Sequence, residues 1–538
     1  MSRFFARIVF LFSCMLFTLG LLVFRLFSLA QNSSVLAAAQ NANSYRVVLD
    51  KSRGCIYDRE LSPLVCAEKV YKVAVLPSLQ SKAYLHRALP AAEFSKIEGR
   101  FSAGKPFVFE TDRFISESQD VKVFLVRKRY AQTPLAVHLI GYCDGELAHG
   151  VAGIEKAYDP VLGAQGASLS LRYPIDAAGR ALSGSEPTVL KEGDNTAGVV
   201  LTLSQKIQTI AQSAARLLPG KGSILVCDVQ NGDILAGVSL PEYKRDNIAA
   251  SIASGDGALL NRNLCAYNIG STFKIAVCAA ALSRGISPSF SNTCNGAMAV
   301  DGLLFHCHKQ TGHGFQTMQT AFANSCNPYF IKLGLSVGKE RLLSTAAALG
   351  LGSPIELCDN MTVPSGNLPA VDELTGKSDL ANVSFGQGSL LATPVHIAKM
   401  ISIVANGGLL VEPRLVRGIL SQDKTLIETE KPVENVRVLS AQVAAQLRSF
   451  MIYTVENGTG RSAKPCALGA GGKTASAETG WSQNGQTMVQ AWFSGFYPAE
   501  KPQYAIVVLC EGGNSGAASC APAFREICNG LYKGGFCS

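Results

Sequence analysis

The chain has 538 residues, of which 47% are hydrophobic and 17% are charged, and its net charge is +9. This length suits roughly two to four domains with a large buried core, and the composition excludes an intrinsically disordered protein. The basic excess forms no run of Lys and Arg and is not interleaved with aromatic residues, which argues against a nucleic-acid-binding protein.

The first predicted element is a membrane-spanning helix. Residues 8–24 carry no charge, and after Arg25 the apolar sequence continues to Ala30. The Arg25 side chain can extend to the membrane surface, which brings the span close to the roughly twenty residues that a bilayer needs. We therefore expect residues 8–30 to form a single transmembrane anchor.

The charges around this segment predict its orientation. Arg3 and Arg7 precede the apolar residues, and basic residues are retained on the cytoplasmic side of a membrane. We expect residues 1–7 to form a cytoplasmic tail and the rest of the chain to lie outside the cell membrane. A cleaved signal peptide is the alternative, since residues 28–30 (SLA) resemble a cleavage site, but the long apolar run and Arg25 favour the anchor.

Residues 31–195 mix short apolar runs with many turn residues. Two segments stand out, residues 53–59 (RGCIYDR) and residues 150–156 (GVAGIEK). Neither pairs a nucleophile with a base or gathers metal ligands, so from the residues alone both are turn or packing segments. Residues 186–198 are rich in Gly, Pro, Asp and Glu and predict a linker.

The remaining residues, 196–538, predict a sheet with helices packed against it. Residues 204–217 have the pattern of an amphipathic helix with Ser204 as its N-cap. Residues 230–233 (QNGD) are a strong hairpin signal between two apolar runs. The predicted strands are 199–203, 223–229, 234–239, 471–476, 489–497 and 504–509, and the predicted helices are 204–217, 271–282 and 521–531.

The sixteen cysteines are scattered, and many stand in apolar runs, as small buried hydrophobic residues do. Cys294 and Cys307 flank a predicted hairpin, and a disulfide between them is left open. Cys307, together with His306, His308 and His313, raises the question of a metal site. Because the four show no clean metal-ligand spacing, the sequence predicts no metal.

Ser271 and Lys274 stand at the start of the predicted helix 271–282. A serine hydroxyl is a weak nucleophile at neutral pH and needs an adjacent base. Residues i and i+3 share one face of a helix, so the Lys274 amine is expected beside the Ser271 hydroxyl. Such a pair alone is a common helix-surface feature. Two later segments give it meaning, residues 325–327 (SCN) and residues 473–475 (KTA).

These three segments, in this order, are typical of penicillin-binding proteins and serine β-lactamases. Over nearly its whole length the chain resembles a class B penicillin-binding protein, a monofunctional peptidoglycan D,D-transpeptidase. It is most similar to the sporulation and elongation enzymes of anaerobic endospore-forming Firmicutes. The segments that carry the resemblance are residues 53–59, 150–156, 261–262, 270–274, 312–314, 324–327, 385–388, 393–394, 491–493 and 495–496.

The resemblance implies an α+β protein with three parts. The N-terminal transmembrane helix is followed by a mixed α/β pedestal domain, similar to the family's dimerisation domain, over residues 31–195. Residues 196–538 then form a penicillin-binding/β-lactamase-like transpeptidase domain. That domain has an antiparallel sheet with helices on both faces and an all-helical region. The family uses no cofactor and no metal in its reaction.

The resemblance also assigns roles. Ser271 would attack the carbonyl of the penultimate D-Ala of a stem peptide, with Lys274 as the base. The charge of Lys473 would lower the pKa of Lys274 by repulsion. Ser325 would pass a proton to the leaving amine, and Asn327 would hold Lys274 and the substrate amide.

Substrate binding follows the same resemblance. Lys473 and Thr474 would bind the terminal carboxylate of the substrate. The backbone N–H groups of Ser271 and Ser476 would form the oxyanion hole, in which each donor contributes about 3–4 kcal/mol. The peptidoglycan stem peptide is therefore the implied substrate and β-lactam antibiotics are the implied inhibitors. No glycosyltransferase domain is visible, so a SEDS-type glycan polymerase is the implied membrane partner.

One catalytic motif departs from the family pattern. Ala475 stands where the third motif ordinarily has glycine, and the family packs ligands closely there. We expect the extra methyl to alter acylation by bulky β-lactams without abolishing it.

Two other functions share these motifs. A serine β-lactamase or β-lactam sensor has them, but it needs no pedestal domain, and no separate glutamate for deacylation is identified. A catalytically weak scaffold that regulates a glycan polymerase is favoured only by Ala475. Stable labelling by penicillin indicates a transpeptidase, rapid release a β-lactamase, and no labelling a scaffold.

Overall fold

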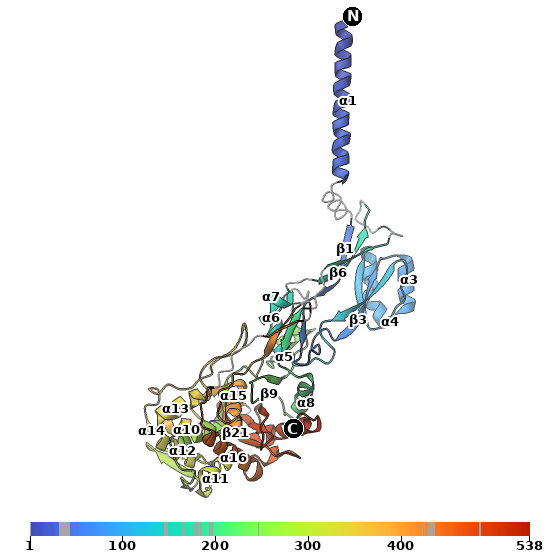
Figure 1. The fold of residues 1–538 in the computed structure, drawn as a ribbon. Coiled ribbons are helices and arrows are strands. Elements are labelled where there is room, and N and C mark those ends of the chain that lie inside the picture. The colour runs from blue at the N-terminus through green and yellow to red at the C-terminus, as the bar shows by residue number, and fades with distance from the viewer. Residues whose placement is uncertain are drawn as a thin grey trace. The chain divides into compact units, whose positions relative to one another are not determined.

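The computed structural model divides the chain into two compact units, drawn in Figure 1. Unit 1 contains Met1–Arg53, Cys66–Arg129 and Gln165–Asn195, and unit 2 contains Gly54–Val65, Tyr130–Ala164 and Thr196–Ser538. The structure describes residues 2–31, 44–144, 149–163, 167–176, 182, 186–192, 197–245, 247–421, 423, 425–428, 436–483 and 486–537.

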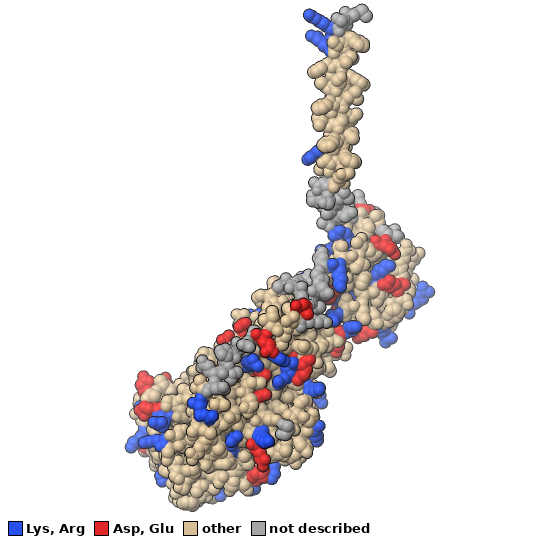
Figure 2. All heavy atoms as spheres, in the orientation of Figure 1, with Lys and Arg blue, Asp and Glu red and all other residues tan. Residues whose placement is uncertain are grey.

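Helix α1 (Ser2–Gln31) contains the predicted membrane segment. Its most apolar stretch of 18 residues has a mean hydropathy of 2.3, and among the described residues this is the one helix long and apolar enough to cross a membrane. Figure 2 shows an uncharged length of helix with basic atoms near both ends. Helix α1 therefore fits a single-pass membrane anchor.

Unit 1 also holds two three-stranded sheets, with strand orders β4-β3-β5 and β1-β6-β7. In the first, alternate side chains of β3 and β4 pack with two helices around Val73, Phe94 and Phe107. Strand β7 occupies part of residues 186–198, so the prediction of a linker there was wrong for residues 188–192, because β7 pairs with β6. Residues 193–196 lie outside the described residues. The elements of unit 1 are β1 (Ser44–Ser52), β3 (Glu68–Val75), α3 (Leu79–Ala88), α4 (Ala91–Glu98), η1 (Gly99–Ala103), β4 (Phe107–Thr111), β5 (Val121–Lys128), β6 (Ala167–Pro174) and β7 (Thr188–Glu192).

Unit 2 is built on a five-stranded antiparallel sheet of order β10-β9-β23-β22-β21. Both predicted hairpins are confirmed: β9 pairs with β10, with Ile234 opposite Cys227, and β22 pairs with β23, with Tyr497 opposite Tyr504. The predicted strand at residues 471–476 is the start of β21, which lies at one edge of the sheet. The strands are β9 (Gly222–Asp228), β10 (Ile234–Leu240), β21 (Gly471–Gln483), β22 (Gln486–Tyr497) and β23 (Tyr504–Glu511).

Helices cover both faces of this sheet (Figure 1). On one face, alternate residues of the strands such as Val226, Phe493 and Val508 form a hydrophobic core with α8 (Gln205–Ala215) and α17 (Ala521–Lys533). On the other, α15 (Pro394–Ala405) packs on β9 and β23, and α16 (Ala441–Asn457) packs beside β21. A further helical region joins this second layer. Its helices are α10 (Lys274–Ser283), α11 (Met318–Ala323), α12 (Asn327–Val337), α13 (Lys339–Ala348) and α14 (Lys377–Ser384).

Smaller elements complete unit 2. Strand β2 pairs in parallel with β8, which pairs in turn with β19. The remaining elements are β2 (Cys55–Tyr57), α5 (Val137–Ile140), α6 (Gly153–Ala157), α7 (Asp159–Gly163), β8 (Gly198–Leu201), α9 (Ile248–Ala253), β11 (Tyr267–Asn268), η2 (Gly270–Phe273), β12 (Asn292–Cys294), β13 (Ala297–Val300), β14 (Leu303–His306), β15 (Gly314–Gln316), β16 (Ile355–Cys358), β17 (Met361–Val363), β18 (Leu391–Ala392), β19 (Val416–Leu420), β20 (Leu426–Glu428), η3 (Arg461–Ala463) and η4 (Gly516–Cys520).

The start of α8 differs from its prediction. Ser204 occupies the N-cap position, but its side chain makes no cap hydrogen bond and its buried hydroxyl has no hydrogen-bond partner in the described structure. Asp58 instead accepts a hydrogen bond from the Gln205 N–H at 3.1 Å and two more from its own turn. A carboxylate at a helix N-terminus satisfies the same unpaired N–H groups and complements the helix dipole.

Candidate functional site

Ser271 lies in a 3₁₀ turn, η2, that leads directly into helix α10. Two glycines let this turn sit tightly against its neighbours. Gly270 has a positive φ of 51°, and a Cβ there would lie 3.0 Å from the Cβ of Ala477 on strand β21. A Cβ at Gly386 would lie 1.8 Å from the Gly270 carbonyl oxygen. The backbone of residues 385–388 thus packs directly against the backbone of the turn that carries Ser271.

Buried polar contacts fix the segment before Ser271 to the sheet. The Trp492 indole N–H donates to the Asn268 carbonyl at 2.9 Å, and the Asn268 N–H donates to the Gln490 side chain at 2.8 Å. Glu511 accepts hydrogen bonds from Arg262 at 2.8 Å and from the Tyr267 hydroxyl at 2.7 Å. Because Arg262 is almost fully buried, this charged pair holds the segment more rigidly than a surface pair would.

Ser325 lies in the short connection between helices α11 and α12. Its φ is 52°, in the left-handed region that costs a non-glycine residue roughly 1–2 kcal/mol. Such strain persists where the surroundings hold it, and it is found most often at functional sites. The Ser325 side chain is nevertheless buried, with 8% exposed.

The Ser325 hydroxyl is the point where the three sequence motifs meet. It donates a hydrogen bond to the Ser271 hydroxyl at 2.9 Å. It accepts hydrogen bonds from the Lys274 amine at 3.1 Å and from the Lys473 amine at 3.0 Å. The Lys274 amine also donates to the Ser325 carbonyl at 2.9 Å and to the Asn327 Oδ1 at 2.8 Å.

This geometry changes one expectation from the sequence. The Lys274 amine was expected beside the Ser271 hydroxyl, on the same face of one helix. Within the described residues, no hydrogen bond joins Ser271 to Lys274, and the printed contacts connect them through Ser325. The reason is local: Ser271 is in the 3₁₀ turn and Lys274 begins the α-helix, so the pair does not share one regular helix.

Both lysine side chains are completely buried, and among the described residues neither forms an ion pair with a carboxylate. Burial lowers the pKa of Lys274 from its ordinary value to about 7. Burial also lowers the pKa of Lys473 well below its ordinary value, and repulsion from Lys274 lowers it further. Desolvation is thus the main cause for both pKa shifts, and the expected repulsion between the two amines is secondary to it.

Sequence reasoning missed two aromatic rings and one hydroxyl. The Lys274 amine lies 5.3 Å from the centre of the Phe330 ring, and the Lys473 amine lies 5.7 Å from that of Phe322. These rings replace water around the amines and give only weak cation–π attraction in return. The Thr459 hydroxyl lies 2.7 Å from that of Thr474. The sequence positions of Phe322, Phe330 and Thr459 do not identify them as site residues, because each has the character of an ordinary core or helix-end residue.

The third motif runs along edge strand β21, with Thr474 and Ser476 on the face opposite to Lys473. Ser476 is exposed, and its hydroxyl accepts a hydrogen bond from the Gly516 N–H at 3.2 Å. Thr474 is 7% exposed and uses its hydroxyl on Thr459. An edge strand leaves one row of backbone N–H and C=O groups unpaired, which an extended peptide can use.

The methyl group of Ala475 does not face an open site. Ala475 is 3% exposed and lies opposite Trp492 in the β21–β22 ladder, so both side chains project from the same face. Trp492 contacts Tyr267 and Asn268 on that face. The methyl is therefore packed against the protein on the face that carries Trp492, which argues against the expectation that it borders the ligand.

The cysteines and histidines are grouped differently from the sequence expectation. In the structure Cys294 and Cys307 form no disulfide. Cys294, Cys307, His313 and Cys326 instead bring their ligand atoms within 4.8 Å of one another. His306 and His308, considered with Cys307 from the sequence, are not members of this group. Cys326 was missed because it stands inside the second motif, on a different turn.

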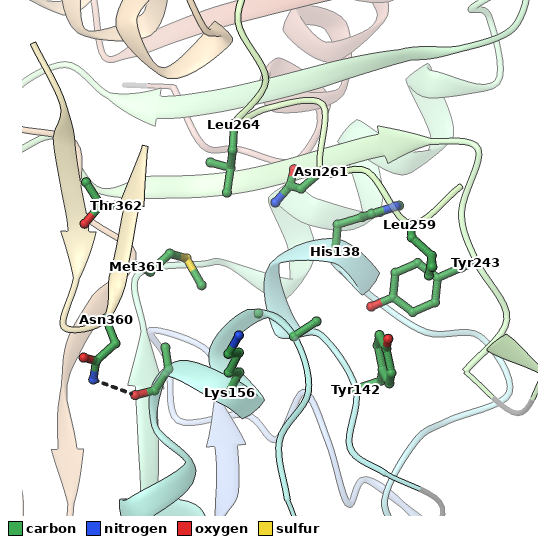
Figure 3. Close-up of a pocket in the computed structure, with 13 residues that line it drawn as sticks. His138, Tyr142, Lys156, Tyr243, Leu259, Asn261, Leu264, Asn360, Met361 and Thr362 are labelled. Atoms are coloured by element: carbon green, nitrogen blue, oxygen red, sulfur yellow. Dashed lines mark hydrogen bonds between the residues drawn. The ribbon is translucent and has the colours of Figure 1, made fainter. Parts of the chain in front are cut away.

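A cavity of about 290 Å³ lies in unit 2, away from the Ser325 cluster (Figure 3). His138, Tyr142, Lys156, Asn261 and Asn360 are among its lining residues, and it shares none with the Ser325 cluster. Burial lowers the pKa of His138 to about 4, and its ring nitrogen lies 2.6 Å from the Ala258 carbonyl. This histidine is a neutral structural group.

Comparison with known proteins identifies the class. Residues 222–529 match the family described as "Penicillin binding protein transpeptidase domain", which is more than half of the chain. The chain therefore belongs to the penicillin-binding protein transpeptidase family, and its relatives place it among the class B penicillin-binding proteins.

Among its relatives is stage V sporulation protein D of Bacillus subtilis, 30% identical over 390 residues, which are 70% of this chain and 58% of that protein. Peptidoglycan D,D-transpeptidase PbpA of Mycolicibacterium smegmatis is 29% identical over 459 residues, or 80% of this chain and 88% of that protein. A protein whose structure was solved in work on "Structural coordination of polymerization and crosslinking by a peptidoglycan synthase complex" has a TM-score of 0.70 at 23% identity. That match covers 97% of this chain and 98% of the other, which shows the same fold.

The packing of Ala475 yields a prediction. Ala475→Gly should lower the free energy of unfolding by about 1–2 kcal/mol, because it removes a buried methyl and adds backbone freedom within a strand. The relative reaction rates with a small and a bulky β-lactam should stay unchanged. Thermal unfolding and second-order acylation rates measure the two effects. Unchanged stability with an altered rate ratio would place the methyl in the ligand site instead.

Proposed function

We propose that this protein is a peptidoglycan D,D-transpeptidase that crosslinks stem peptides through an acyl-enzyme on Ser271. The observation that carries the proposal is the convergence of all three motifs on the Ser325 hydroxyl, within hydrogen-bond distance of Ser271, Lys274 and Lys473. Family membership and the names of the relatives support the reaction class.

In this mechanism, Ser271 attacks the carbonyl of the penultimate D-Ala and D-Ala leaves as an amine. Neutral Lys274 is the base, and its lowered pKa leaves a large neutral fraction near pH 7. For this transfer the Ser325 hydroxyl, 2.9 Å from the Ser271 hydroxyl and 3.1 Å from the Lys274 amine, would turn to accept from Ser271 and donate to neutral Lys274, so that the proton reaches Lys274 through it. Ser325 then returns a proton to the leaving amine. Asn327 holds the Lys274 amine in place.

The two unpaired lysines support an anionic substrate. A buried ammonium ion without a counter-ion is costly, and an incoming carboxylate supplies the missing charge. The Lys473 amine donates to the Thr474 carbonyl at 2.8 Å, and the two residues would bind the terminal carboxylate shared by stem peptides and β-lactams, whose charge favours the protonated amine. The edge of β21 would pair with the peptide backbone, and the N–H groups of Ser271 and Ser476 would form the oxyanion hole.

The alternatives are less well supported. A scaffold without catalysis was favoured only by Ala475, and the buried position of that methyl weakens the argument. A β-lactamase or β-lactam sensor shares the cluster around Ser325, but the relatives of the chain are named for transpeptidation or sporulation. Release of a bound penicillin within seconds would favour hydrolysis.

Labelling with a fluorescent penicillin tests the nucleophile and the base. Ser271→Ala should abolish covalent labelling and Lys274→Ala should slow it by several orders of magnitude, because each removes a group that acts in bond formation. Peptide mass spectrometry locates the adduct. Cys510→Ala, in strand β23, is the matched control and should label normally. An adduct on another residue, or normal labelling of Lys274→Ala, would refute these roles.

The acylation rate should depend on pH in a defined direction. Below pH about 7 the Lys274 amine is protonated and cannot accept a proton, so the second-order rate with penicillin should rise as pH increases through that value and then level off. The apparent pKa belongs to the coupled Lys274–Lys473 pair. Stopped-flow labelling from about pH 5 to about pH 9 measures it, with thermal unfolding as the control for stability. A rate that falls across this range contradicts the role of Lys274.

We further propose that the protein stays anchored by α1, with residues 31–538 outside the cell membrane. The apolar length of α1 and the basic residues before it support this topology. The mature protein should keep its N-terminus and should be degraded by protease added to spheroplasts. A mature N-terminus at Gln31 would show that the segment is a cleaved signal peptide.

A membrane glycan polymerase of the SEDS type is the proposed partner. The structural relative named for a peptidoglycan synthase complex supports it, as does the absence of a recognisable glycosyltransferase sequence in this chain. The tagged protein should co-purify with such a polymerase from membranes in mild detergent. Loss of the interaction in a variant with α1 replaced by an unrelated span would locate the contact in the membrane.

A further inference from the structure

We propose that Cys294, Cys307, His313 and Cys326 bind one zinc ion and that this metal holds the Ser325 turn in its active geometry. Three buried thiols rarely meet an imidazole without a reason, because a buried cysteine ordinarily stands alone as a small apolar residue. Cys294, Cys307 and Cys326 are each no more than 2% exposed, and His313 is half-buried. Three thiolates and one imidazole are the ligand set of a closed, structural zinc site.

The distances fit one tetrahedral ion. Zinc lies about 2.3 Å from sulfur and about 2.0 Å from nitrogen, so neighbouring sulfur and nitrogen ligands should be about 3.6 Å apart. The His313 Nδ1 lies 3.4 Å from the Cys307 Sγ and 3.7 Å from the Cys294 Sγ. A disulfide needs sulfur atoms about 2.05 Å apart, and these cysteines are free. Soft sulfur ligands and the absence of carboxylates from this cluster disfavour calcium and magnesium.

The backbone around the cluster is shaped to bring the ligands together. Cys294 ends β12, which pairs with β15 directly after His313. The Cys307 N–H donates to the Gly296 carbonyl at 2.8 Å. This hydrogen bond connects the end of the β13–β14 hairpin to the turn that follows Cys294. Gly312 has a φ of 78°, and a Cβ there would lie 2.2 Å from the Cys294 carbonyl oxygen. Only glycine permits this close approach.

Cys326 connects the cluster to the catalytic hydroxyl. It stands between Ser325 and Asn327, so its Sγ binds the metal while its two neighbours contact Lys274. The Asn327 side-chain N–H also donates to the His306 carbonyl at 3.1 Å, next to Cys307. A bound metal would therefore restrain the left-handed Ser325 turn from one side. Without it, the turn could relax and carry the hydroxyl away from Ser271.

The first experiment measures the metal directly. The full chain should be purified in detergent under anaerobic conditions without chelator. Inductively coupled plasma mass spectrometry should then find about one zinc ion per chain. Cobalt exchanged into the chain should give the intense sulfur-to-cobalt absorption of a tetrahedral thiolate site. Cys294→Ala should lose the metal, whereas Cys510→Ala, equally buried and also in a strand, should retain it. Circular dichroism checks the fold of each variant.

Wild-type protein alone can overturn the proposal, even where a variant fails to fold. A chain without metal and without the cobalt–thiolate absorption would refute the site, as would a Cys294–Cys307 disulfide found by peptide mass spectrometry in anaerobic protein. Either result would show that the thiols meet for another purpose.

The second experiment tests the link to catalysis and rests on the proposed function. Removing the metal with a chelator should slow penicillin labelling of Ser271 at least about tenfold, and added zinc should restore it. Cys294→His, which keeps a ligand, should retain both metal and labelling, unlike Cys294→Ala. Metal-loaded protein that never labels would refute the proposed function and leave the site intact. Unchanged labelling after complete metal loss would refute the positioning role.

Discussion

The central constraint of this structure is the complete burial of two lysine amines beside one serine hydroxyl. Moving an ammonium ion out of water costs several kcal/mol, and the described residues offer Lys274 and Lys473 no carboxylate. The fold meets this cost partly by lowering both pKa values and partly by packing. The site can stay assembled without substrate only if its walls are rigid. This explains why the segment before Ser271 is fastened to the sheet through Trp492 and the Arg262–Glu511 pair.

The strained Ser325 turn follows from the same requirement. A single hydroxyl must accept from two amines and donate to a third group, which uses all of its hydrogen-bonding capacity. A regular helix would point the side chain along its own surface, whereas a left-handed residue between α11 and α12 turns it into the site. Phe322 and Phe330, one from each helix, pack around the amines. The helices thus support the turn and exclude water at the same time.

Much of the fold could be predicted from the sequence because the signals are local. The Asn231-Gly232 turn and the alternating strands beside it specify one hairpin, and the apolar strands near the C-terminus specify the other. The three motifs could be recognised because their residue types are rare in that order. Prediction from local sequence failed where a residue's structural partner comes from a distant segment of the chain. Ser204 has the character of a cap, but Asp58, far earlier in the chain, occupies that role. The direction of the Ala475 methyl depends on the register of β21 against β22, which no single strand reveals.

The cysteine cluster shows the same limit most clearly. Its four ligands come from the end of β12, the end of β14, the turn before β15 and the turn before α12, so no short spacing marks them. Sequence spacing identifies metal sites when two ligands share a turn, and here each turn supplies only one. Yet the placement is consistent with function. Cys326 is the residue between the two motif side chains that contact Lys274, and its thiol points into the cluster while Ser325 points at the nucleophile. One peptide segment therefore joins the catalytic hydroxyl to the thiols, so any change in what the thiols bind must reach the Ser325 turn.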